Sequence, residues 1–100
     1  MNNEILTQTI ARYVMSLYSA SQATHYAEDR PLYRIYLEQA GVLLALSVTD
    51  ADQKEIQRYI GQHERTWGYT FLQDPVYKEP EGAWQEVKRI ASRTIGPADK

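Results

Sequence analysis

The stretch HERTWGYTFLQDP, residues 63–75, decides how the third part of the chain folds. Trp67 and Phe71 stand four residues apart with Gly68 between them, so a helix either ends at this glycine or runs through it. A glycine in the left-handed conformation often ends a helix, and residues 69–72 would then form a lid. A continuous helix would instead place both aromatic rings in a core.

The residues before this stretch favour the continuous helix. Residues typical of one buried helix face recur at spacings of three and four: Ile56, Ile60, His63, Trp67 and Phe71. The stripe does not break at Gly68, and a glycine inside a helix costs only about 1 kcal/mol relative to alanine. We therefore predict one helix that ends before Pro75, because the residue preceding a proline disfavours helical dihedral angles. A helix that ends at Gly68 remains the alternative.

Proline, glycine and aspartate divide the chain into four segments with helical periodicity. Proline suits the start of a helix and is excluded from its interior, and Thr49 or Asp50 is the predicted N-cap of the third helix. The predicted helices span about 3–27, 31–47, 50–73 and 81–95. Short links make consecutive helices antiparallel. The predicted fold class is all-α, an up-and-down antiparallel bundle of about four helices.

The helices differ in how much of their surface is apolar. The first carries one stripe: Leu6, Ile10, Tyr13, Leu17, Ala20 and Thr24. The fourth buries Ala83, Val87, Ile90, Ala91 and Thr94, with Trp84 at the flank. The second is apolar over most of its circumference, and only one strip departs from this: Arg34, Glu38, Gly41 and Ala45. Such a helix is buried by several neighbours, so we expect it to be the hub of the bundle or part of an oligomer interface.

Length and composition exclude several classes of protein. The 100 residues predict a single helical domain over 1–100 with a frayed tail at 96–100. The longest apolar run, Val42–Leu46, has five residues, whereas a membrane helix needs roughly 20. The opening MNNEILTQT lacks the basic and apolar regions of a signal peptide. Without cysteine there is no disulfide or thiolate site, and we expect a cytoplasmic protein.

His63 is the strongest candidate for a functional residue because it lies within an otherwise apolar stripe. Metal sites in helix bundles use repeated inward carboxylates and Glu-x-x-His pairs, but this chain has two histidines, and Glu64 points about 100° away from His63. We predict a core imidazole hydrogen-bonded to a tyrosine, with no metal and no cofactor. Neither a nucleophile-elbow serine nor a glycine-rich phosphate loop is present, which argues against an enzyme.

The sequence favours a nucleic acid as partner less than it favours another protein. The segment AGVLLALSVTDADQKEIQRYIG has the outline of a helix-turn-helix, but acidic residues at the start of its second helix would face phosphates. The net charge of −2 argues the same way. Two basic strips are expected to be solvated faces, with RNA or an acidic protein as the alternative: Lys54, Arg58 and Arg65, and Lys88, Arg89 and Arg93.

The strongest indication of a partner-binding surface is on the first helix. Its core stripe leaves Met15, Tyr18, Gln22 and Tyr26 on other sides, and exposed Met and Tyr are typical of partner surfaces. The expected function is protein–protein interaction by a small non-catalytic bundle, as an accessory, regulatory or immunity-type protein or as a homodimer. Helix four or residues 69–80 could instead cover this face. The alternative function is a ligand sensor or enzyme with a pocket lined by His63, Tyr59 and Trp67.

Overall fold

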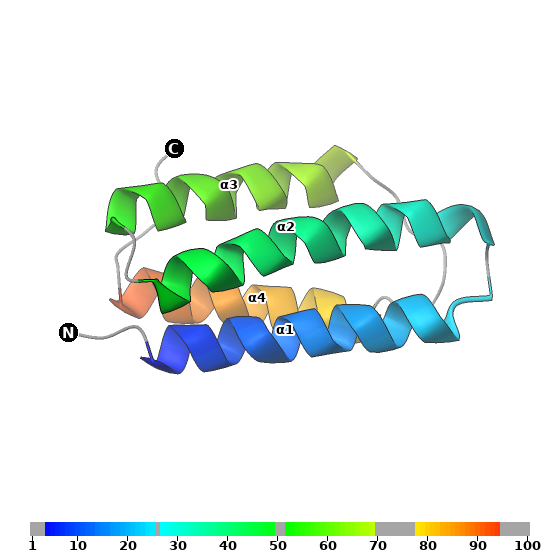
Figure 1. Cartoon of the computed structure of the whole chain (residues 1–100), viewed down its shortest axis with the longest axis horizontal. Coiled ribbons are helices and arrows are strands. Elements are labelled where there is room, and N and C mark those ends of the chain that lie inside the picture. The colour runs from blue at the N-terminus through cyan, green and yellow to red at the C-terminus, as the bar shows by residue number, and fades with distance from the viewer. Residues whose placement is uncertain (1–3, 26, 50–51, 70–77, 95–100) are drawn as a thin grey trace.

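Four helices run alternately up and down around one core in the computed structural model (Figure 1). They are α1 (Glu4–Ala23), α2 (Arg30–Val48), α3 (Gln53–Tyr69) and α4 (Lys78–Thr94), with a 3₁₀ turn, η1 (Ala27–Asp29), before α2. The structure describes residues 4–25, 27–49, 52–69 and 78–94, and only the backbone of 67–69 and 94. The predicted all-α, up-and-down antiparallel bundle is confirmed.

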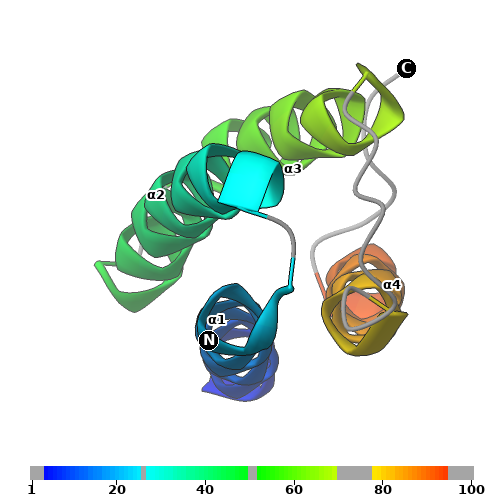
Figure 2. The same ribbon diagram turned by 90° about the vertical axis from the view of Figure 1, so that its right-hand side faces the viewer.

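The end-on view shows how the helices surround the core (Figure 2). α1 packs against both α2 and α4, and α2 packs against α3. Glu64 joins α3 to α4, because its Oε1 accepts a hydrogen bond of 2.6 Å from the Trp84 indole. Of the two roles predicted for α2, the buried hub is not observed, since three of its large apolar side chains are exposed: Ile35, Val42 and Val48. Its part in an oligomer interface stays a prediction.

The core follows the helical stripes closely. The whole stripe predicted for the first helix is buried, including Thr24 just beyond the end of α1: Leu6, Ile10, Tyr13, Leu17, Ala20 and Thr24. Trp84, expected at the flank of α4, is only 1% exposed. It shares a stripe with Pro80, Val87 and Ala91, which are buried, whereas Ala83 and Ile90 are only half-buried. α4 is therefore rotated so that its largest ring fills the centre of the bundle.

Two helix ends near the α2–α3 link differ from the prediction. Asp52 caps α3: its side-chain Oδ1 accepts the Lys54 N–H at 3.1 Å, and its carbonyl accepts the N–H of Glu55 and of Ile56. Thr49 instead closes α2, because its N–H and its hydroxyl both donate to the Ala45 carbonyl. Asp50, the other predicted cap, lies outside the described residues.

The remaining ends also shift by a few residues. α1 stops at Ala23 rather than 27, because the chain turns through η1 to bring α2 back antiparallel. α4 starts at Lys78 rather than 81, since Pro80 sits in the first turn, where a helix needs no N–H donor. α3 does not end at Gly68 but continues to Tyr69. The predicted extension to 73, its end before Pro75 and the 96–100 tail lie outside the described residues. Within the described ranges, no helix has the length and hydropathy needed to cross a membrane.

Candidate functional site

Side chains from all four helices meet at His63 in the centre of the bundle. The ring centroids of Tyr13 (α1), Tyr36 (α2) and Trp84 (α4) lie 5.6, 5.7 and 4.7 Å from the imidazole of His63 (α3). All three rings stand edge-on to it, at 70°, 77° and 85°. This arrangement places the positive edge of one ring against the negative face of another, so His63 forms the aromatic centre of the core.

Both ring nitrogens of His63 have protein partners. Nε2 lies 2.6 Å from the Tyr13 hydroxyl, and Nδ1 lies 2.6 Å from Oε1 of Gln39. An amide oxygen can only accept, so Nδ1–H donates to Gln39 and Nε2 accepts the Tyr13 O–H, as a neutral imidazole requires. The hydrogen bond to a tyrosine is the one predicted. We call His63 with Tyr13 and Gln39 the histidine node.

Burial keeps the histidine node uncharged at neutral pH. Desolvation of the buried imidazole lowers the pKa of His63 from 6.5 to about 4, and the neighbouring negative charge of Glu64 opposes this only in part. The node ties α3 to α1 through Tyr13 and to α2 through Gln39. A ligand could reach either nitrogen only after breaking one of these hydrogen bonds. The node therefore serves to hold helices together.

Of the other two residues of the predicted pocket, the structure describes the side chain of Tyr59 only. Tyr59 is half-buried and packs against the edge of the core, and the side chain of Trp67 lies outside the described residues. Among the residues that the structure describes, no group of three or more His, Asp or Glu side chains could hold a metal ion. Glu64, the carboxylate nearest in sequence to His63, binds the Trp84 indole and lies 3.1 Å from Nζ of Lys88.

Sequence reasoning missed Gln39 and the role of Glu64. Gln39 is a polar residue on the side of α2 next to the core positions Tyr36 and Leu43, and that isolated amide was the available signal. Nothing in the sequence pointed from Glu64 to Trp84, because the two lie on different helices and 20 residues apart.

The predicted partner residues lie on an exposed face formed by α1 and α2. The side chains of Met15 and Tyr18 are 69% and 58% exposed, and Gln22 is exposed too. Tyr26 lies outside the described residues. A hydrogen bond of 3.0 Å between the Thr7 and Ser47 hydroxyls sets α2 beside this flank of α1. The α1–α2 face consists of Ala11, Val14, Met15, Tyr18 and Gln22 with Leu37, Gly41, Leu44 and Val48.

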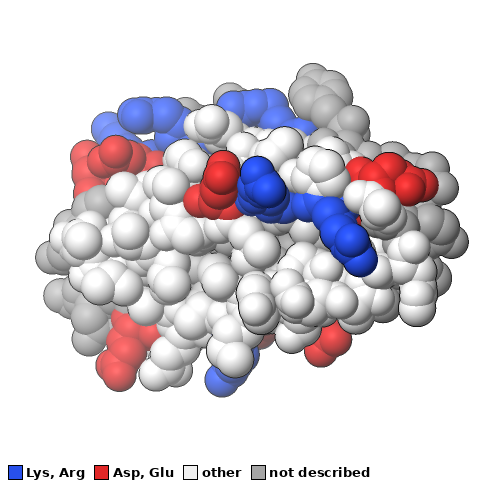
Figure 3. Space-filling view, turned by 45° about the vertical axis from the view of Figure 1, so that its right-hand side comes forward, with Lys and Arg blue, Asp and Glu red and all other residues white. Residues whose placement is uncertain are grey.

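The α1–α2 face is largely uncharged, although exposed Arg34 and Glu38 lie beside Gly41 at its margin on α2. Figure 3 looks obliquely onto α1 and α2 and shows a broad area without Lys, Arg, Asp or Glu. Val48 contributes to its exposed apolar surface at 63% exposure, and Val14, Leu37 and Leu44 are half-buried beneath. Contiguous apolar surface of this kind is typical of protein-binding sites.

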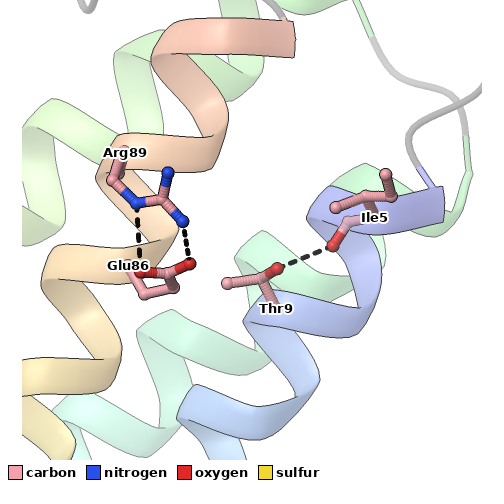
Figure 4. A network of polar contacts seen from close by, with 4 residues as sticks. All are labelled: Ile5, Thr9, Glu86 and Arg89. Carbon is pink, nitrogen blue, oxygen red and sulfur yellow. Dashed lines mark hydrogen bonds and ion pairs between the residues drawn. The ribbon is translucent and has the colours of Figure 1, made fainter.

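Several charged side chains on α4 form ion pairs, one within α4 and one with α3. Arg89 donates two hydrogen bonds to the Glu86 carboxylate, on the side of α4 that lies near Thr9 of α1 (Figure 4). These bonds hold the pKa of Glu86 below its usual value. Lys88 is paired with Glu64. Two of the three cations in the predicted basic strip on α4 thus have acidic partners, which fits an ordinary solvated surface.

Comparison with known proteins gives no relative. No protein-family model matches the chain, and no curated protein or solved structure matches it significantly. The function must therefore be argued from the geometry of the two candidate sites.

Proposed function

We propose that this protein acts by binding another protein through the α1–α2 face, in an accessory, regulatory or immunity-type role, rather than by catalysis. The observation that carries the proposal is the exposure of Met15 and Tyr18 on a helix whose only charged residues are Glu4 and Arg12. Methionine and tyrosine are favoured at binding surfaces because they adapt to a partner and combine apolar area with a polar end.

The distribution of charge supports this choice of face. α4 carries seven charged residues among 17, placed mainly on its outer side, as a water-facing helix should. By contrast, no charged residue occurs between Gln39 and Thr49 of α2, although several side chains in that range are exposed. The outer surfaces of α1 and of the second half of α2 are therefore less suited to water than that of α4, whereas the first half of α2 carries exposed Arg30, Arg34 and Glu38.

The histidine node supports the proposal in a second way. Tyr13 and Gln39 belong to the two helices that form the face, and both are bound to the same imidazole. The node thereby fixes α1 relative to α2 before a partner arrives. A surface held in its binding geometry loses less conformational entropy on association. Because both His63 nitrogens serve this purpose, the alternative ligand or enzyme function has less support.

The test replaces Met15 and Tyr18 by glutamate together. We expect Met15→Glu with Tyr18→Glu to abolish capture of the partner by immobilised protein from an extract of the cells that make it, because charges in the centre of an interface must be desolvated. The thermal midpoint should barely move, since both side chains are exposed. Mass spectrometry of the captured proteins and circular dichroism provide the two measurements.

A matched control adds the same charges elsewhere. Gln62→Glu with Gln85→Glu places two glutamates on exposed positions of α3 and α4 and should leave capture intact. Unchanged capture by the Met15 and Tyr18 variant would refute binding through this face. Unfolding of that variant would show that the two side chains belong to the core in solution.

A further inference from the structure

We infer that the α1–α2 face binds an amphipathic helix of another protein, whose acidic end lies over Arg30 and Arg34. The inference rests on the proposed function, because it names the chemistry of the partner that this face takes. The two arginines belong to the first half of α2 and lie beyond the end of the uncharged area. Figure 3 shows charged side chains along the border of that area.

The two arginines continue the line of face residues along α2. Arg30 and Val48 are 18 residues apart, which is about five full turns, so they point to the same side of the helix. Arg34 and Gly41 are seven residues apart, about two turns, and share a side in the same way. All four residues are exposed. The α2 part of the face is therefore apolar at its Val48 end and positive at its Arg30 end.

The acids close to these arginines do not pair with them. Glu38 lies one turn after Arg34 but points about 80° away from Arg30 around the helix. Asp29 is buried, and Glu28 lies in the η1 turn before α2. Among the described residues, neither Arg30 nor Arg34 forms an ion pair. Both guanidinium groups are therefore available to carboxylates of a partner, and each can donate two parallel hydrogen bonds to one of them.

The rest of the face suits the apolar side of a helix. Val14, Leu37 and Leu44 are half-buried and form its floor, and the side chains of Met15 and Val48 are exposed. A helix laid along the seam between α1 and α2 would contact these side chains with residues spaced i, i+3, i+4 and i+7. The face extends over 12 residues of each helix, about 17 Å, which is the length of about three turns of one partner helix.

Gly41 lies between the apolar part of the face and the arginines. It is in the interior of α2, where glycine is among the least favourable residues. A Cβ built at this position would meet nothing within 4 Å, so no neighbour within the described chain requires the glycine. The backbone of a partner helix could approach α2 closely at this point, because no side chain stands in its way.

The combination of an apolar floor with two free cations selects among partners. A basic helix would place like charges opposite the arginines, which is unfavourable. A phosphate backbone would pair with the arginines but would leave the apolar floor without a contact. An amphipathic helix with acidic residues beyond one end of its apolar stripe matches both parts of the face.

The test uses a displayed library of helical peptides of about 18 residues, about five turns. Each peptide carries an apolar stripe, and the residues at both of its ends vary at random. Selection on the immobilised chain should enrich peptides with Asp or Glu beyond one end of the stripe. The best peptide is then synthesised, and fluorescence anisotropy measures its Kd.

Charge reversal locates the acidic end of the peptide on the face. We expect Arg30→Glu with Arg34→Glu to raise the Kd at least about tenfold. The matched control, Arg58→Glu with Arg65→Glu, changes the net charge equally at exposed positions of α3 and should leave the Kd unchanged. A peptide whose acidic residues are replaced by lysine should bind the Arg30 and Arg34 variant more tightly than the parent chain. Circular dichroism would verify that both variants are folded.

Selected peptides without an excess of acidic residues overturn the inference, and so does a Kd that the Arg30 and Arg34 variant changes no more than the control does. If those peptides still lose binding to the Met15→Glu with Tyr18→Glu variant, the proposed function stands without the acidic end. Sedimentation equilibrium of the chain alone provides a further check. A dimer that the Met15 and Tyr18 variant dissociates would assign the face to a second copy and would also overturn the inference.

Discussion

His63 is the residue on which the packing of the bundle converges. It accepts a hydrogen bond from α1, donates one to α2 and contacts the Trp84 ring of α4. A buried imidazole is tolerated here because each nitrogen has a partner suited to its neutral form. Burial of the imidazole disfavours its charged form, which makes the stability of the fold depend on pH.

We expect stability to fall as the pH drops below 6.5. The folded pKa of His63, about 4, lies below the ordinary histidine value of 6.5. In this range the unfolded chain binds a proton that the folded chain does not, and the loss levels off below the folded pKa. Between pH 7 and pH 5 the expected loss from His63 alone is about 2 kcal/mol. Denaturant unfolding at the two pH values measures it.

His63→Leu provides the comparison for this measurement. The variant should be less stable at pH 7 by about 1–3 kcal/mol, because the buried Tyr13 hydroxyl and the side-chain oxygen of the half-buried Gln39 both lose their hydrogen bonds to the imidazole. It should also lose about 2 kcal/mol less than the parent chain between pH 7 and pH 5. The other titratable groups are common to both proteins, so the difference between the two profiles reports His63. Parallel pH profiles would mean that His63 is reached by water in solution.

At the scale of the helices, local hydrogen bonds determine where each helix begins and ends. The buried stripe of each helix determines which side packs into the core. The α2–α3 link shows this clearly, because Thr49 and Asp52 serve two different helices although only two residues separate them. Thr49 donates backward to Ala45, whereas Asp52 accepts from the N–H of Lys54. The short link leaves α2 and α3 antiparallel, which brings Gln39 to His63.

The cap of α3 can be tested by substitution of Asp52. We expect Asp52→Ala to lower the free energy of unfolding by about 1 kcal/mol, because the Lys54 N–H loses its side-chain acceptor. Asp52→Asn keeps an acceptor oxygen at the same place and should cost less. Denaturant unfolding of the two variants gives the difference. Equal losses would show that the charge at the helix start matters more than the hydrogen bond.

At the scale of the whole molecule, each of the four helices contributes one ring to the same core cluster. Tyr13, Tyr36, His63 and Trp84 come from four different helices and meet in one cluster. Removal of any one helix would expose the other three rings. The aromatic cluster therefore predicts that the bundle unfolds as one cooperative unit.

Trp84 fluorescence can test this cooperativity. The chain has two tryptophans, so Trp67→Phe leaves Trp84 as the single reporter of the core. We expect its fluorescence and the helical circular dichroism to show the same denaturant midpoint, as a two-state transition requires. An earlier fluorescence transition would mean that α4 separates from the bundle while the other helices persist.

The sequence alone determined the number of helices, the up-and-down order and the core stripe of α1, because helical periodicity and short links are local properties. It also identified Met15 and Tyr18 as residues outside that stripe and His63 as a residue inside another. The rotation of each helix about its axis and the hydrogen-bond partners of His63 were decided by the tertiary structure. Trp84 entered the core, and Gln39 and Tyr13 became the partners of His63, because such contacts depend on how helices distant in sequence pack together. The α1–α2 face likewise exists only because the antiparallel packing of α1 and α2 places weakly charged outer sides of the two helices next to each other.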